Sequence, residues 1–117
     1  MRDLAELKEQ LRLFARERDW EQFHSPKNLA AALIVEAAEL LEHFQWRTAA
    51  ESDALDPATR EQVAQELADV LIYLVRLADR LDIELLDAAE RKIALNARKY
   101  PADRVRGSAR KRDHSAD

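Results

Sequence analysis

Four acidic residues form two pairs whose spacing suits metal chemistry: Glu36 with Glu39, and Glu66 with Asp69. Each residue of a helix advances ~100°, so members of a pair three positions apart lie on one face. Two carboxylates about 5–6 Å apart repel each other by roughly 3 kcal/mol at an effective dielectric of about 20. Four converging carboxylates therefore either take up protons or bind a cation. An oxygen-only ligand set predicts Mg²⁺, with Mn²⁺ as the alternative, and such an ion can bridge phosphate oxygens and activate water.

The helices that must carry these pairs begin at two clear signals. Ser25-Pro26 and Asp56-Pro57 each place an N-cap residue before a proline at the first helical position. They predict helices over residues 26 to about 48 and 57 to about 81. Each acidic pair borders the apolar stripe of its own helix, so we expect the pairs to converge where the two helices pack.

Two further helices complete the prediction. Leucines at three- and four-residue spacing predict a helix over residues 4–18, followed by a stretch without clear period over 19–24. Residues 51–56 are predicted as a loop. Asp82 is predicted to cap a fourth helix that ends by Tyr100, because Pro101 disfavours helical geometry in the residue before it. The run 70–75 is apolar nearly all round, which makes the third helix the most buried. The fold class is all-α, a four-helix-bundle-like subunit completed by oligomerisation.

Composition limits the classes of function. The 117 residues include one glycine, three prolines and no cysteine, so disulfides and thiolate metal sites are excluded. No apolar run approaches ~18 residues, and we expect a cytoplasmic protein that does not span a membrane. Residues 102–117 carry a net charge of +2 and the remainder −6, which disfavours binding to duplex nucleic acid. We predict a helical catalytic domain over 1–101 and a basic, flexible tail over 102–117.

Longer motifs around the acidic pairs resemble a known family. They are RDWEQFH at residues 18–24, ELLEHFQW at 39–46, ELADVLIYL at 66–74 and RKYP at 98–101. Together with the ExxE and ExxD pairs they resemble the MazG-like, all-α nucleoside triphosphate pyrophosphohydrolases, in the branch that contains dCTP pyrophosphatase. The similarity covers roughly residues 4–112. Many members have adjacent glutamates before the first xxE, whereas Val35 precedes Glu36 here, as in that branch.

The resemblance implies cleavage of a nucleoside triphosphate, dCTP or a related pyrimidine nucleotide, to a monophosphate and pyrophosphate. It also implies a homodimer or homotetramer. It makes the four acids the ligands of the catalytic metal, and Glu39 is our choice for the residue that positions water. It further implies a substrate-binding set of Trp20, Trp46 and His24 around the base, Asn96 and Tyr100 near the sugar and base, and Lys27, Lys92 and Lys99 toward the phosphates.

Residue chemistry supports part of this set on its own. Indole faces stack on any base, which suits Trp20 and Trp46. Lys92, Asn96 and Lys99 share a helical stripe that Tyr100 adjoins, and a basic stripe fits a polyphosphate. Alternatively, the two tryptophans are core or interface residues, and the basic stripe is a solvated helix face.

Three other functions stay open or are disfavoured at this point. A di-iron bundle needs Glu-x-x-His on two helices, and the sequence offers only Glu21 to His24. Phosphoribosyl-ATP pyrophosphohydrolase is an alternative activity. A non-catalytic helical interaction module is the other alternative, although acids beside apolar seams would be costly there.

Overall fold

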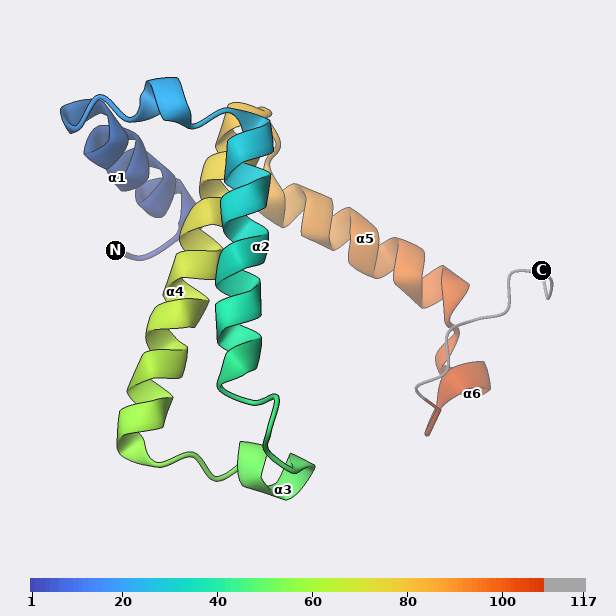
Figure 1. Ribbon diagram of the computed structural model, residues 1–117. Helices are drawn as coiled ribbons and strands as arrows, with labels where there is room; N and C mark the ends of the chain where they lie inside the picture. The colour runs from blue at the N-terminus through green and yellow to red at the C-terminus, as the bar shows by residue number, and fades with distance from the viewer. Residues whose placement is uncertain (109–117) are drawn as a thin grey trace. The chain divides into compact units, whose positions relative to one another are not determined.

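The computed structural model describes residues 1–108, which form helices and no strand, so the all-α prediction is confirmed. The elements are α1 (Leu4–Glu17), the 3-10 turn η1 (Glu21–Phe23), α2 (Pro26–Glu42), α3 (Ala49–Ser52), α4 (Pro57–Arg80), α5 (Leu85–Lys99) and α6 (Ala102–Val105) (Figure 1). The chain divides into two compact units, Met1–Ile83 and the part from Glu84 onward. None of the described helices is both long and apolar enough to cross a bilayer.

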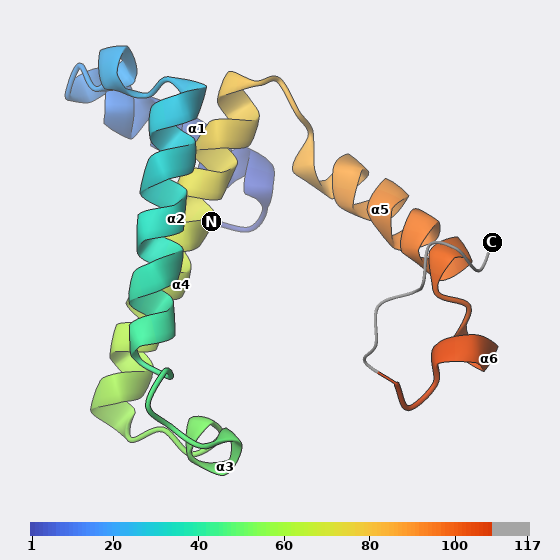
Figure 2. The ribbon, with the colours of Figure 1, turned by 45° about the vertical axis from the view of Figure 1, so that its right-hand side comes forward.

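The first unit is built on α2 and α4, which lie side by side in both views (Figures 1 and 2). α1 packs against α4, and α3 lies at the end of the α2–α4 pair away from α1. Leu29 of α2 and Ala15 of α1 are almost fully buried. Four of the six buried residues among 1–108 belong to α4, as expected for the most buried helix.

The starts of α2 and α4 are where the sequence predicts them. The Ser25 hydroxyl accepts from the Asn28 amide at 3.2 Å, and the Asp56 carboxylate accepts from the Thr59 amide at 3.2 Å. Each cap satisfies an amide that has no partner within the helix. The caps set the first turn of both helices and thereby the register in which the acidic residues face each other.

The predicted end of the second helix is wrong by about six residues. α2 ends at Glu42, and the chain continues in tight turns in which Phe44 donates to the carbonyl of Leu41. Arg47 donates from Nε to the carbonyl of His43, which supplies a side-chain partner beyond the helix end. A short helix, α3, follows; it begins with a capping box between Thr48 and Glu51, and its end at Ser52 lies inside the predicted loop. This capping box requires an extended Thr48, so helix cannot run through it.

Two aspartates replace the glycines that usually end helices. Asp19 after α1 and Asp82 after α4 have φ of 52° and 55°. After α4, Ile83 donates to Ala78 and Asp82 to Asp79, which is the Schellman pattern. The prediction that Asp82 caps the fourth helix is therefore wrong, because its left-handed backbone ends α4.

Glu84 caps α5 instead, and its carboxylate accepts from the amides of Leu86 and Asp87. The predicted tail begins with α6, and residues 109–117 lie outside the described part of the chain. The boundary at residue 101 and the oligomeric state stay predictions.

Candidate functional site

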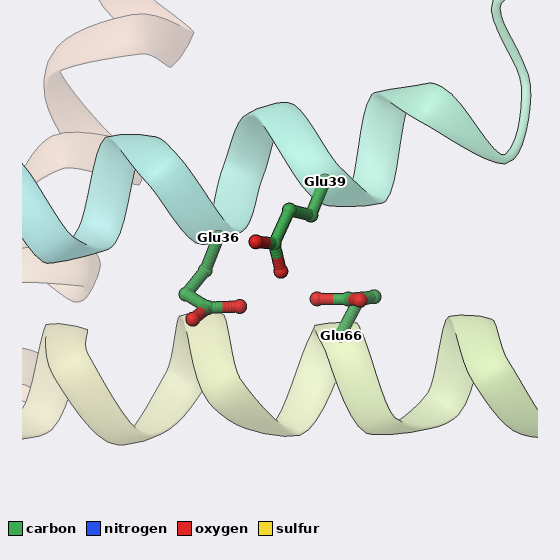
Figure 3. A group of neighbouring side chains, drawn as sticks. All are labelled: Glu36, Glu39 and Glu66. Atoms are coloured by element: carbon green, nitrogen blue, oxygen red, sulfur yellow. The ribbon is translucent and has the colours of Figure 1, made fainter.

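Three glutamates from two helices converge in the first unit. Glu36 and Glu39 of α2 and Glu66 of α4 point toward one another between the helices (Figure 3). One carboxylate oxygen from each lies within 4.8 Å of those of the other two. All three side chains are half-buried. The group can therefore present several oxygens to one small cation from two directions.

The cluster is electrostatically unbalanced without a cation. Burial, then Glu39 by hydrogen bonding and charge, then Glu66 and Asp69, raise the pKa of Glu36 to about 7. Oε2 of Glu36 and Oε2 of Glu66 are buried without a hydrogen-bond partner. Nε2 of His43 lies 3.9 Å from Oε1 of Glu66. Unpaired buried carboxylate oxygens are costly, and an oxygen-ligated divalent cation would satisfy them, so these residues fit such an ion.

Asp69 lies at the edge of this cluster. It is not part of the three-residue group, although its charge contributes to the raised pKa of Glu36. It is one turn from Glu66 on α4 and also lines a neighbouring cavity. Asp69 thus connects the carboxylate cluster to that cavity.

The cavity has a volume of about 220 Å³ and lies between α1, the segment before α2, and α4. Its lining is mostly apolar and aromatic and includes a few polar groups. The lining residues are Leu11, Phe14, Ala15, Trp20, His24, Asp69, Ile72, Tyr73 and Arg76. Such a mixture is typical of sites that bind small molecules.

The turn after α1 positions Trp20 at this cavity. The Trp20 amide donates to Ala15 across the left-handed Asp19, which closes a second Schellman motif. The Trp20 ring meets Phe14 edge-on at a centroid distance of 5.7 Å and His24 at 6.4 Å. Burial, followed by the charges of Arg76 and Arg80, lowers the pKa of His24 below its usual range.

Arg76 is a polar residue of the cavity that the sequence analysis did not select. It follows Asp69 and Tyr73 at i+7 and i+3 on one stripe of α4. The apolar run before it predicts a core helix, and a charged residue on that helix in the stripe of Asp69 was the signal available. Its side chain is nearly completely buried.

The remaining predicted substrate residues do not line this cavity. Trp46 is 89% exposed and lies in the turns after α2, although the sequence predicts it to be inside that helix. Lys27 is exposed in the first turn of α2. The other four belong to the second unit, and their relation to the cluster stays a prediction: Lys92, Asn96, Lys99 and Tyr100.

The fold and the paired carboxylates define a known class. The MazG-like family model matches residues 31–113, and the chain belongs to the MazG-like family. It is 51% identical over 100 residues to human dCTP pyrophosphatase 1 and 50% identical over 98 residues to the rat protein. These alignments cover 84% and 82% of this chain, and 59% and 58% of those proteins. The chain thus spans about three fifths of the length of the curated relatives it matches.

A solved structure agrees with this assignment. A pyrophosphatase from Archaeoglobus fulgidus, known from a crystal structure, superposes with a TM-score of 0.79 at 45% sequence identity. The match covers 83% of this chain and 91% of the archaeal one. The resemblance of the sequence motifs to this family is therefore confirmed.

Proposed function

We propose that this chain hydrolyses a nucleoside triphosphate between the α and β phosphates, releasing a nucleoside monophosphate and pyrophosphate. The observation that carries the proposal is the convergence of Glu36, Glu39 and Glu66 with unpaired buried oxygens. The printed names of the relatives, dCTP pyrophosphatase 1 and a pyrophosphatase, support the same reaction. They also favour dCTP or a related pyrimidine deoxynucleotide as substrate.

Glu36, Glu39 and Glu66 would hold a divalent cation, with Asp69 completing the set from its edge. Mg²⁺ is the ion we expect, and Mn²⁺ is the alternative. A cation held there supplies positive charge for phosphate oxygens and lowers the pKa of a bound water. Within this set we assign Glu39 to positioning the water that attacks the phosphorus.

The cavity beside Asp69 is our candidate for the base pocket. Trp20 offers a ring for stacking, and His24 lies next to it. Because phosphates would be drawn to the cation at the glutamates, the apolar and aromatic cavity is left for the base. The proposed roles of Trp46, Lys27, Lys92, Asn96, Lys99 and Tyr100 depend on the family resemblance.

The test is pyrophosphate release from each of the eight standard NTPs and dNTPs and from phosphoribosyl-ATP, with Mg²⁺ and with EDTA. We expect Mg²⁺-dependent release that is fastest with a pyrimidine deoxynucleotide. Exclusive turnover of phosphoribosyl-ATP would identify the alternative activity. Silence on every substrate would contradict the proposal and favour a non-catalytic module.

Variants test the assignment of the acids. Glu39→Gln and Asp69→Asn should each abolish turnover while the circular dichroism spectrum stays helical. Glu42→Gln is the matched control, since Glu42 is exposed on α2 one turn from Glu39. Retention of more than about a tenth of the rate would remove that residue from the metal-binding set, because such a loss is only about 1.4 kcal/mol of barrier.

A further inference from the structure

Arg76 has donors that the protein does not satisfy. Its Nε is buried with no hydrogen-bond partner. Nη1 lies 3.5 Å from Oδ2 of Asp79, and Nη2 lies 3.4 Å from Nδ1 of His24, which are long distances for hydrogen bonds. A guanidinium carries five donors, so most of this group's capacity is unused.

Asp79 cannot meet that demand because Arg12 already occupies it. Arg12 of α1 donates to both carboxylate oxygens of Asp79, at 2.7 Å from Nε to Oδ2 and at 2.5 Å from Nη2 to Oδ1. A two-point pair of this kind is the strong geometry for arginine and carboxylate. Arg12 is further paired with Glu9 at 2.9 Å, whereas the buried Arg76 keeps only long contacts beside the cavity. Buried, poorly paired charge is costly unless a ligand contributes the acceptor.

The cavity indicates the chemistry of that acceptor. An engineered cavity of about 150 Å³ binds benzene, so a cavity of about 220 Å³ has room for one six-membered ring with its substituents. Trp20, Phe14 and Tyr73 supply aromatic walls, which favours a planar ring. A free anion is disfavoured because Asp69 also lines the cavity. A neutral heterocycle with a carbonyl oxygen offers a planar ring to the aromatic walls and an acceptor to Arg76, and it brings no negative charge near Asp69.

We propose that Arg76 determines base selectivity by donating a hydrogen bond to the 2-carbonyl oxygen of a pyrimidine base in this cavity. The inference rests on the proposed function for the nature of the ligand. The 2-carbonyl is shared by cytosine, uracil and thymine, whereas adenine has no carbonyl and guanine carries its carbonyl at position 6 of a larger, two-ring base. Arg76 thereby favours pyrimidine nucleotides as a class, and the rest of the lining selects among them.

The first measurement compares Arg76→Ala with the unmodified protein at pH 8 on dCTP and on a dCTP analogue whose base is 2-aminopyridine joined to the sugar through carbon 5, which stays neutral and keeps the ring nitrogen and the amino group but lacks the 2-carbonyl oxygen. A charge-assisted hydrogen bond predicts that either change alone raises KM about ten- to hundredfold. Both changes together should raise KM no further than either one, because they remove the same bond. Independent, multiplying effects of the two changes would overturn the inference, and so would an unchanged KM in Arg76→Ala.

Two control variants separate recognition from a structural role. Arg80→Ala removes the same charge one turn along α4 from an exposed residue outside the cavity lining, and it should leave KM unchanged. Arg76→Gln keeps a donor without the charge and should recover part of the discrimination between dCTP and its analogue. Equal losses in Arg76→Ala and Arg80→Ala would overturn the inference.

A binding assay keeps the inference testable if no nucleotide is turned over. The probe is dCMP in EDTA, with quenching of Trp20 fluorescence as the readout in a Trp46→Phe background. We expect Arg76→Ala to weaken dCMP binding at least tenfold. Arg80→Ala should bind dCMP as tightly as the background protein does. Weakened binding without turnover would contradict the proposed function alone, whereas turnover with unaffected dCMP binding would overturn the role of Arg76 alone.

Discussion

The glutamate cluster holds charge in a place where the chain itself does not neutralise it. Glu36 is disfavoured as an anion by burial and by Glu39, and its Oε2 and that of Glu66 have no hydrogen-bond partner. Residues selected for folding alone would not be arranged in this way, since replacing like charges with neutral groups would remove the repulsion. The cluster therefore has the character of a site whose cost is offset by a ligand.

Glu36→Gln should show this conflict directly. In EDTA at pH 8 we expect the variant to have a higher melting temperature than the unmodified protein, because the disfavoured charge is gone. Added Mg²⁺ should raise the melting temperature of the unmodified protein by several degrees and have little effect on the variant. Differential scanning calorimetry checks both results, with Glu42→Gln as the control that should behave like the parent. An equal response to Mg²⁺ in all three proteins would contradict a role for Glu36 in metal binding.

The Arg12–Asp79 pair predicts a different response at the residue scale. Asp79→Asn should lower the free energy of unfolding by about 2–4 kcal/mol, because it removes the carboxylate nearest to the buried Arg76 and leaves Arg12 with Glu9 alone. Asp87→Asn is the control, since its pair with Arg91 is exposed and is worth under about 0.5 kcal/mol. Urea titration of both variants measures the difference.

The same pair sets a pH dependence. The hydrogen bond from Arg12 lowers the pKa of Asp79 below its usual range, against the opposing effect of burial. A lowered pKa in the folded state contributes stability above the unfolded value near 4, and this contribution is lost as pH falls through the lowered pKa. The stability gap between the parent and Asp79→Asn should therefore narrow below about pH 4. A gap that stays constant from pH 7 to pH 3 would contradict this account.

At the scale of elements, capping signals proved more informative than periodicity alone. Ser25 and Asp56 locate the starts of α2 and α4, and with them the glutamates. The end of α2 was missed because Phe44 continues the apolar stripe of Leu40, while Arg47 and the Thr48 capping box end the helix locally. The Thr-x-x-Glu motif at 48–51 was the available signal. Asp82 was misassigned because aspartate serves both as an N-cap and, less often, in left-handed positions.

The left-handed aspartates give a prediction at this scale. Asp82→Gly should raise the free energy of unfolding by about 0.5–1 kcal/mol, since glycine adopts φ of 55° without a Cβ penalty. Asp53→Gly is the matched control, because Asp53 has φ of −83° and gains nothing from glycine. Thermal unfolding in EDTA checks the two variants. Stabilisation of both, or of Asp53→Gly alone, would contradict the backbone explanation.

The structure brings together Glu36, Glu39 and Glu66, which the helical repeat places on facing helices, whereas the sequence did not single out Arg76, whose surroundings depend on tertiary packing. Three-residue spacing places each acidic pair on one face of its helix. Arg76 could not be selected in the same way, because its importance depends on Asp79 being occupied by Arg12 from α1, 67 residues from Asp79 along the chain. The spacing of residues along the sequence does not reveal that Arg12 and Arg76 compete for Asp79.

At the scale of the whole molecule, the first unit leaves large apolar side chains exposed. Ile34 and Leu41 form one stripe of α2, and Leu67, Leu71 and Leu74 form one of α4. Contiguous apolar surface of this kind usually marks an interface. It is consistent with the predicted homodimer or homotetramer.

Ile34→Lys tests that prediction. Ile34 is 66% exposed, so the substitution should cost the isolated chain little, whereas a charge in an apolar interface is disfavoured. We expect light scattering to show a shift of mass from oligomer toward monomer. Gln65→Lys is the control, since Gln65 is exposed on α4 away from the leucine stripe and should leave the mass unchanged. A monomeric parent protein would contradict the prediction outright.

The single carboxylate of Asp79 links the cavity to the docking of α1. Arg12 and Arg76 compete for it, so any ligand that engages Arg76 leaves Asp79 entirely to Arg12. Thermodynamic reciprocity then requires that ligand binding strengthen the attachment of α1 and that loosening α1 weaken the ligand. Amide hydrogen exchange should consequently slow when the cavity fills, both around Leu11, Phe14 and Ala15, which line the cavity, and in the first turns of α1 that do not. The first helix would in this sense report on occupancy of the cavity.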